Sequence, residues 1–291
     1  SLLDELRDPT GFFIDNAGNI YVTDNRNIRI VKWKPRASSG QVVAGGNCKD
    51  YLLENDVFMV SYLLNSTSSN IVLDNNRTMF ICDRGNLRVQ RWFQNDNQDQ
   101  TIIANISCAG VNLDNQGFLY VTDEDGHRVI KYPGNEIVAG GNEAGSVLNQ
   151  IWNPGSIYLD RNHSVFVADI INDRVVIWPA GVRESLIVAG GNGQGNGTHQ
   201  LQEPHAVLVD YMGTVYVADT FNSRIVRWLP NSQSGVIIID ALGANLNGKN
   251  MFIPVDMAFD RKGNLYVADI FNNRILMFPI GKSSCVTSMY H

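Results

Sequence analysis

One pattern occurs six times along the chain, always with the same internal spacing. An aspartate that ends a short apolar run is followed by an aromatic residue six positions later and by a second aspartate nine positions later. An arginine follows at fourteen positions and another aromatic residue at eighteen. The first aspartates are Asp15, Asp74, Asp114, Asp160, Asp210 and Asp260. Such a period indicates one structural unit per repeat, stacked on its neighbours to bury a shared core.

Each repeat is predicted to contain four short β-strands. In the fifth copy, Val207–Val209 reads as a buried strand, Asp210–Gly213 as a tight turn, and Val215–Ala218 and Arg224–Trp228 as two further strands. A fourth strand is indicated by runs such as Ile187–Gly191. Four-stranded antiparallel units repeated in this way are typical of a propeller. We therefore predict an all-β chain, a single six-bladed β-propeller over 1–291, with blades at about 9–47, 68–105, 108–142, 154–192, 204–240 and 254–289.

Two stretches resemble a known repeat family. The segments 204–222 (PHAVLVDYMGTVYVADTFN) and 254–274 are similar to NHL repeats, and the other copies follow the same pattern more loosely. The resemblance implies a six-bladed β-propeller. It leaves function open, because that family includes enzymes, receptor ectodomains, adhesion proteins and RNA binders.

The repeated aspartate and arginine are interpreted as structural. One acid and one arginine per blade, five residues apart across a turn, suit an ion pair or backbone hydrogen bonds that fix each blade. A catalytic constellation would not be expected to repeat six times around a ring.

A histidine and an aspartate at the start of two inner strands are the candidate ligand-binding residues, namely His205 and Asp256. One branch that the chain resembles, the peptidyl-hydroxyglycine lyases, places a histidine at the His205 position of several blades and holds zinc with them. Here the equivalent residues are Thr10, Ser69, Ala109, Gly155 and Val255. We therefore expect no zinc, no cofactor and no catalytic residues, and a solvated surface histidine is the simpler interpretation of His205.

Several features predict a secreted glycoprotein. The chain begins at Ser1 rather than at a methionine, as a processed chain would. Five N-glycosylation sequons exceed the roughly three that chance would give, and they lie at Asn65, Asn76, Asn105, Asn162 and Asn196. Four cysteines allow three pairings, or they remain buried free thiols. The strand positions favour Cys82–Cys108, because both would lie on the same face of adjacent blades.

Charge argues against one class of partner. The net charge is −6 and the 23 lysines and arginines are spread along the chain, so there is no basic face to bind nucleic acid. No apolar run is long enough to span a membrane. We expect an extracellular, non-catalytic binding or scaffold module that contacts proteins or itself through the segment 51–64 or an outer strand at 284–289. The alternative is a six-bladed-propeller hydrolase or lyase with a site at the channel mouth.

Overall fold

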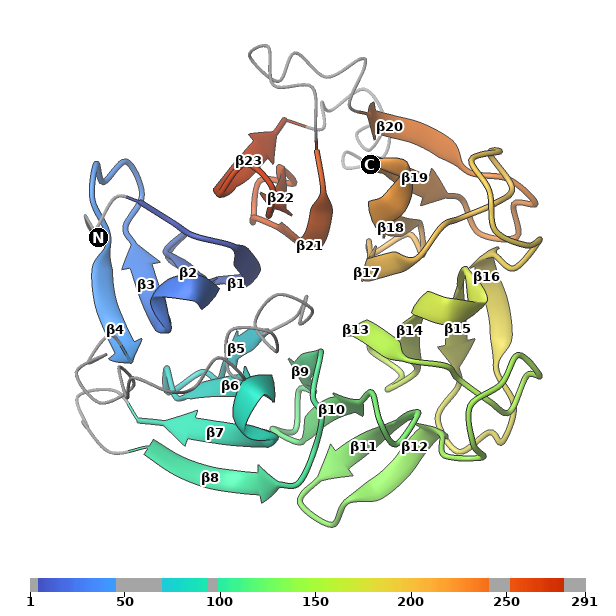
Figure 1. Ribbon diagram of the computed structural model, residues 1–291, viewed down its shortest axis with the longest axis horizontal. Coiled ribbons are helices and arrows are strands. Elements are labelled where there is room, and N and C mark those ends of the chain that lie inside the picture. The colour runs from blue at the N-terminus through green and yellow to red at the C-terminus, as the bar shows by residue number, and fades with distance from the viewer. Residues whose placement is uncertain (1–4, 46–69, 94–98, 241–251, 280–291) are drawn as a thin grey trace, which may run out of the picture.

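The computed structural model is a six-bladed β-propeller, as the repeat predicts (Figure 1). It describes residues 5–45, 70–93, 99–240 and 252–279. Each blade is an antiparallel sheet in which neighbours in the chain are neighbours in the sheet. Five blades have four strands, and three strands of the sixth lie within the described residues. The outer strand expected at 284–289 and the linker segment 51–64 fall outside them, so self-association stays a prediction.

The strands occupy equivalent positions in every blade. The innermost strands are β1 (Pro9–Ile14), β5 (Ile71–Leu73), β9 (Val111–Leu113), β13 (Pro154–Leu159), β17 (Pro204–Val209) and β21 (Pro254–Phe259). The second strands are β2 (Ile20–Asp24), β6 (Met79–Asp83), β10 (Leu119–Asp123), β14 (Val165–Asp169), β18 (Val215–Asp219) and β22 (Leu265–Asp269). The third strands are β3 (Arg29–Trp33), β7 (Arg88–Trp92), β11 (Arg128–Tyr132), β15 (Arg174–Trp178), β19 (Arg224–Trp228) and β23 (Arg274–Phe278). The outermost strands are β4 (Gln41–Gly45), β8 (Asp99–Ala104), β12 (Glu136–Gly140), β16 (Leu186–Gly190) and β20 (Val236–Asp240).

In the part of the chain that the structure describes, helix is confined to single turns between the second and third strands. These 3₁₀ turns are η1 (Asn25–Asn27), η2 (Arg84–Asn86), η3 (Ile170–Asn172) and η4 (Thr220–Asn222). Within the described ranges, no helix has the length and apolar character needed to cross a bilayer.

The hydrophobic core lies between blades rather than within one sheet. One cluster joins Val175 of the fourth blade to Val207 and Val226 of the fifth, and another joins Val129 of the third to Val167 of the fourth. Because side chains alternate along a strand, one face of each blade packs on the preceding blade and the other on the next. The ring is therefore stabilised by the seams between blades.

The seam between the last and first blades has both apolar and polar contacts. Phe12 and Val22 pack against Val255 and Ala268. In addition, the Phe12 amide donates to Asp256 Oδ2 at 2.9 Å, and the Asp8 amide donates to Asn273 Oδ1 at 2.8 Å. Hydrogen bonds between residues at opposite ends of the chain thus help to close the ring.

Candidate functional site

The four-residue turn between the second and third strands, called here the b–c turn, is held by the repeated ion pair. The arginine Nε donates to the aspartate Oδ2 in all six blades, at 2.6–2.9 Å. In the fourth blade, Arg174 also donates to the carbonyls of Ser146 and Gln150, while Asp169 accepts the amide of Trp152. The pair therefore fixes both the turn and the linker that enters the blade, which confirms the structural interpretation.

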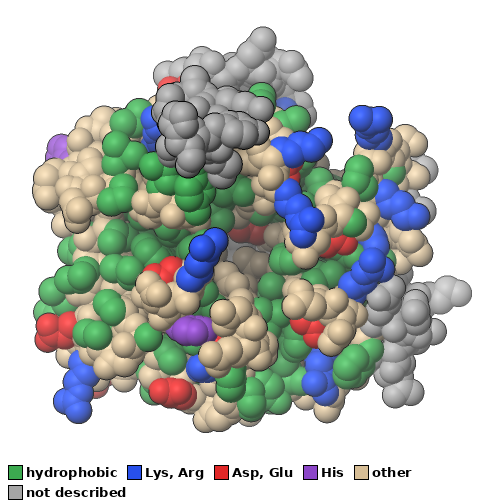
Figure 2. All heavy atoms as spheres, turned by 180° about the vertical axis from the view of Figure 1, so that it is seen from behind, with side chains coloured by type: hydrophobic (Ala, Val, Ile, Leu, Met, Phe, Trp, Pro, Cys, Tyr) green, Lys and Arg blue, Asp and Glu red, His purple; other side chains and the backbone are tan. Residues whose placement is uncertain are grey.

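The six turns differ in the side chains that they carry. Their first residues are Asn25, Arg84, Glu124, Ile170, Thr220 and Ile270, and their second residues are Arg26, Gly85, Asp125, Ile171, Phe221 and Phe271. These turns lie at the same end of the blades as the start of the inner strands, where β17 begins with Pro204 and His205. We call this end of the channel the mouth. Figure 2 views the disc from behind Figure 1, and the face seen there is hollowed at its centre.

His205 lies at the mouth and is buried, not solvated as expected, with 7% of its surface exposed. Its ring stacks on Phe221 of the b–c turn of the same blade, with centroids 6.4 Å apart and planes 17° apart. Its Nδ1 lies 3.0 Å from the Glu203 carbonyl oxygen. Because a carbonyl can only accept, Nδ1 carries the proton and Nε2 is left with its lone pair.

Burial lowers the pKa of His205 below its ordinary value of 6.5, a hydrogen bond to Glu203 opposes that shift, and the positive charge of Arg84 adds to it. Arg84 belongs to the second blade and His205 to the fifth, which face each other across the channel axis. The b–c turn that carries Arg84 follows the end of β6, at the same end of the channel as the start of β17, so both side chains belong to the mouth. His205 is therefore a neutral base opposite a fixed positive charge.

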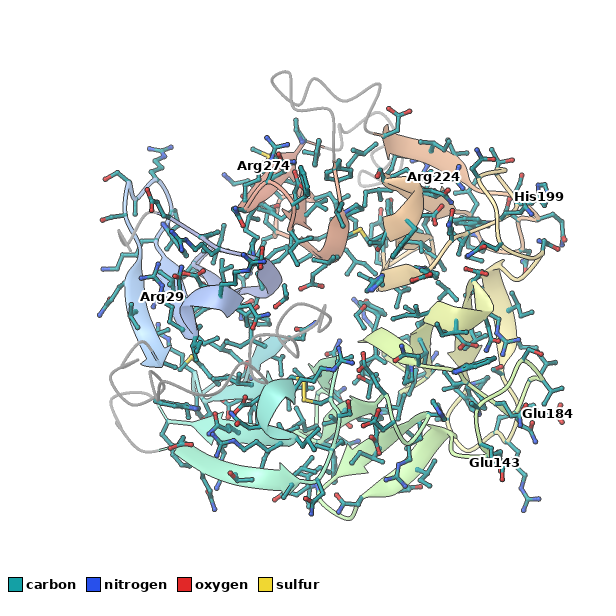
Figure 3. All side chains as sticks on the ribbon, viewed as in Figure 1. Arg29, Glu143, Glu184, His199, Arg224 and Arg274 are labelled. Carbon is teal, nitrogen blue, oxygen red and sulfur yellow. A yellow bond between two sulfur atoms is a disulfide. The ribbon has the colours of Figure 1, made fainter. Side chains whose placement is uncertain are left out.

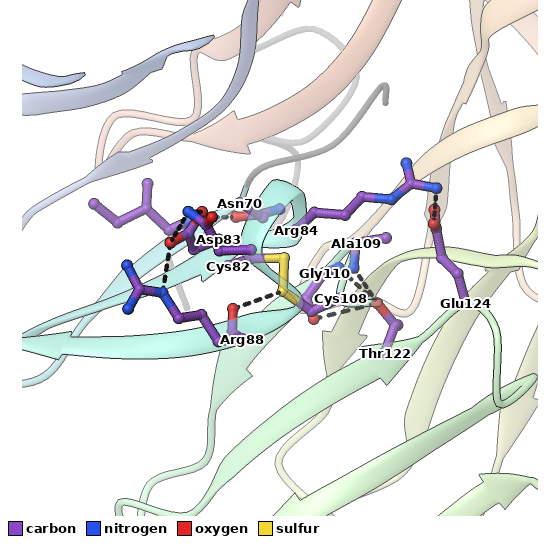
Figure 4. Close-up of a disulfide and its surroundings, with 12 residues drawn as sticks. Asn70, Cys82, Asp83, Arg84, Arg88, Cys108, Ala109, Gly110, Thr122 and Glu124 are labelled. Atoms are coloured by element: carbon purple, nitrogen blue, oxygen red, sulfur yellow. Dashed lines mark hydrogen bonds and ion pairs between the residues drawn. A yellow bond between two sulfur atoms is a disulfide. The ribbon is translucent and has the colours of Figure 1, made fainter. Parts of the chain in front are cut away.

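An ion pair between adjacent blades holds Arg84. Arg84 Nη2 contacts Glu124 Oε2, and only 4% of the glutamate side chain is exposed (Figure 4). Burial raises the pKa of Glu124 to about 7, although the Arg84 charge acts in the opposite direction. Among the described residues Oε2 has no hydrogen bond of good geometry, so the contact is an ion pair and Arg84 supplies the compensating charge.

The turn positions could have revealed Arg84 and Glu124 from the sequence. Both are the first residue of their b–c turn, and the other four blades have an uncharged residue there. A position that is charged in only two adjacent blades is not explained by the repeat itself. Sequence reasoning considered only the start of the inner strand and missed this signal.

A disulfide lies beside this ion pair. Cys82 at the end of β6 is bonded to Cys108 just before β9, with Cα atoms 5.7 Å apart, and this is the pairing favoured from the sequence. Both cysteines are fully buried between the second and third blades. Figure 4 shows Arg84 extending from the turn after Cys82 toward Glu124 of the next blade. The covalent bond and the ion pair therefore join the same two blades. Cys48 and Cys285 fall outside the described residues.

Asp256, the second candidate, has a structural environment. It is 6% exposed, and its carboxylate accepts the amides of Phe12 and Met257, both at 2.9 Å. Burial raises the pKa of Asp256 to about 7, against these two amides. No hydrogen bond or ion pair joins Asp256 to His205, and both lie within the described residues. We therefore assign Asp256 to ring closure rather than to the site.

One further histidine and the described sequons lie away from the mouth. Figure 3 places His199 at the outer rim, far from the channel axis. The asparagines of four sequons are exposed, at Asn76, Asn105, Asn162 and Asn196, and Asn65 lies outside the described residues. Within the described ranges, no three histidine, cysteine, aspartate or glutamate side chains come together in a way that could hold a metal ion.

Comparison with known proteins gives a fold but no family. No family model and no curated protein sequence matches this chain. The resemblance to NHL repeats is therefore not confirmed, whereas the six-bladed propeller fold is.

Solved structures with the same fold include enzymes. A gluconolactonase from Xanthomonas campestris superposes with a TM-score of 0.63 at 12% identity, over 92% of this chain and 85% of that one. A catalytically inactive histidine-to-alanine variant of virginiamycin B lyase from Staphylococcus aureus, with quinupristin, gives 0.58 at 12% identity, over 97% and 87%. An auxiliary nutrient binding protein from Bacteroides thetaiotaomicron gives 0.66 at 13% identity, over 93% and 68%. At such identity the likeness shows the fold alone.

The lyases and gluconolactonases among these neighbours contradict the expectation of a non-catalytic scaffold, and they agree better with the alternative of a hydrolase or lyase. The expectation rested on the lack of a repeated histidine set. A site can instead be assembled from one residue of each of several blades, because the ring brings different side chains to a common mouth.

Proposed function

We propose that the chain is an enzyme, a hydrolase or a lyase, whose active site lies at the mouth with His205 as general base. The observation that carries the proposal is a buried imidazole whose Nδ1 is held by the Glu203 carbonyl, at the same mouth as the Arg84 guanidinium. A base whose Nδ1 is held by a backbone carbonyl has its Nε2 oriented and available. Solved structures with this fold support the proposal, since one of them is an inactive histidine-to-alanine variant of a lyase.

The two groups have complementary roles at a carbonyl substrate. Nε2 of His205 takes a proton, either from the attacking water in hydrolysis or from the carbon beside the carbonyl in elimination. The guanidinium of Arg84 stabilises the negative charge that develops on the carbonyl oxygen. The resulting imidazolium then returns the proton to the leaving oxygen, so that protons balance in either reaction.

Glu124 acts as a positioning residue for Arg84. Its carboxylate holds Nη2 of the guanidinium in place, while the side chain of Arg84 remains 21% exposed. A planar guanidinium has five donor hydrogens in a fixed geometry, so one end can bind Glu124 while the other binds substrate.

The test is a panel of carboxylic esters and lactones assayed with the full chain. We expect His205→Gln to lower kcat/KM by about 10²–10⁴-fold, as is typical when a general base is lost. The matched control is His199→Gln at the rim, which should keep full activity. Product masses separate the reactions, because hydrolysis adds one water and elimination adds none.

The pH dependence gives a second readout that a structural role would not produce. The rate should fall as the pH drops through the pKa of His205, which lies below 6.5. In Arg84→Gln the fall in rate on acidification should begin at a higher pH, because the charge that lowers the pKa of His205 is gone. No turnover of any ester or lactone by the wild type, or full activity of His205→Gln, would overturn the proposal.

We also propose that the protein is secreted and carries N-linked glycans on at least two sequons. The exposure of Asn76, Asn105, Asn162 and Asn196 supports this. Intact mass of the protein from a secreting eukaryotic host, before and after glycosidase treatment, tests it. A mass that does not change would refute the glycan proposal.

A further inference from the structure

The mouth has an apolar half. The second b–c turn residues of the fourth, fifth and sixth blades are Ile171, Phe221 and Phe271, which are 41%, 59% and 55% exposed. Single exposed apolar residues are normal on a protein surface, but three at equivalent positions of adjacent blades set one side of the mouth apart from the other. We call these three residues the apolar arc.

The other half of the mouth is charged. The corresponding turns of the first three blades carry Arg26, Arg84, Glu124 and Asp125. Arg26 is paired with Asp8, and Arg84 with Glu124. The mouth thus presents an apolar surface on one side of the axis and ionic groups on the other.

His205 and Arg84 link the two halves. The imidazole of His205 stacks on Phe221, the middle residue of the arc, and its pKa responds to the charge of Arg84. Within the described residues the only ion-pair partner of Arg84 is Glu124, which it contacts through Nη2. The guanidinium therefore has donors left for a ligand, next to an apolar platform.

We propose that the site takes a small organic anion with a flat apolar or aromatic body, which lies on the apolar arc while its anionic group binds Arg84. Charge complementarity selects an anion, since a guanidinium binds carboxylate-like groups through paired hydrogen bonds. Aromatic faces select a flat body, since rings stack in offset or edge arrangements. The inference deepens the proposed function by naming the class of substrate for the same site.

The test is a fluorescence titration of the full chain with two probes that share their rings. 8-Anilinonaphthalene-1-sulfonate is the anion, and N-phenyl-1-naphthylamine is the neutral counterpart. We expect Phe221→Ala and Phe271→Ala to weaken both probes by about three- to tenfold. Arg84→Gln should weaken the anion by about tenfold or more and leave the neutral probe within about twofold.

Matched controls lie in turns at the other end of the blades. Met212→Ala removes a side chain of similar exposure (57%) between β17 and β18, and Arg161→Gln removes an exposed charge between β13 and β14. Neither should change either affinity, and circular dichroism melts should show that all variants are folded. Equal weakening by the controls, or no binding of the anion, would overturn this proposal. Arc-dependent and Arg84-dependent binding without turnover of any ester or lactone would overturn only the proposed function.

Discussion

At the scale of single residues, the inner strands show how polar side chains satisfy an open sheet edge. Among the strands that the structure describes, the inner strand of each blade has no neighbour on its channel side, so the amides on that edge need other partners. Asp256 accepts the Phe12 amide of the next blade, and Ser156, at the equivalent position two blades earlier, accepts the Val207 amide at 3.0 Å. A carboxylate and a hydroxyl thus do the same task in different blades.

This equivalence predicts how stability depends on Asp256. Asp256→Ala leaves the buried Phe12 amide unpaired and should lower the free energy of unfolding by about 1–3 kcal/mol. Asp256→Ser, which installs the acceptor that the fourth blade uses, should recover most of that loss. Urea denaturation of the three proteins at one pH measures it. Equal stability of the wild type and Asp256→Ala would show that the hydrogen bond contributes nothing to closure.

The pH dependence of stability follows from the same residue. The folded pKa of Asp256, about 7, lies above the ordinary value of 3.8, so the folded state holds a proton that the unfolded state has released. The stabilisation of the folded state by protonated Asp256 is therefore fully present below pH 3.8, and it is lost as the pH rises through about 7. Asp256→Ser should lose less stability than the wild type between pH 5 and pH 8. Parallel pH profiles of the two proteins would contradict this.

At the scale of elements, the repeat predicted the strands well, because its residues make the same local contacts in every blade. Each inner strand ends directly before its first aspartate, whose Oδ1 accepts amides of the following turn, as Asp210 does for Met212 and Thr214. The site was less predictable. His205 was found as an exception within the repeat, but its burial depends on Phe221 and on the ring as a whole. Arg84 and Glu124 are 40 residues apart, and only the packing of adjacent blades brings them together at the mouth.

The repeated ion pairs are not equal in strength, and this can be measured. Arg174 is 4% exposed and binds Asp169 and linker carbonyls, whereas Arg128 is 39% exposed and, within the described residues, its only ion-pair partner is Asp123. We expect Arg174→Ala to cost about 3–5 kcal/mol, because it leaves a buried carboxylate uncompensated. Arg128→Ala should cost about 0–1 kcal/mol, as solvent-screened pairs do. Chemical denaturation compares them, and equal losses would contradict the dependence on burial.

At the scale of the whole molecule, the Cys82–Cys108 bond makes one of the six seams covalent. It closes a loop with a sequence separation of 26, for which the loss of chain entropy in the unfolded state corresponds to about 3–4 kcal/mol. Replacing both cysteines with alanine should lower the stability by up to that amount. Because the bond lies beside Arg84 and Glu124, its removal should also weaken binding of the anionic probe. The affinity for the neutral probe should change less.

A reducing agent supplies the control for that experiment. It should lower the melting temperature of the wild type and leave the double alanine variant unchanged. If alkylation of the unfolded wild type without reductant labels all four cysteines, the disulfide is absent and the prediction is wrong.

The ion pairs that enclose each b–c turn have a consequence for how such a protein evolves. The backbone of every turn is set by an aspartate before it and an arginine after it, and the fourth turn residue adopts φ near +50° in all six blades. The second turn residue lies between these fixed points, and in the fourth, fifth and sixth blades its side chain is exposed. The exposed position of each turn can therefore be substituted in one blade without changing the turns of the others. Mutation, or an engineer who exchanges the second turn residue between blades, can give the mouth a new specificity while the framework stays intact.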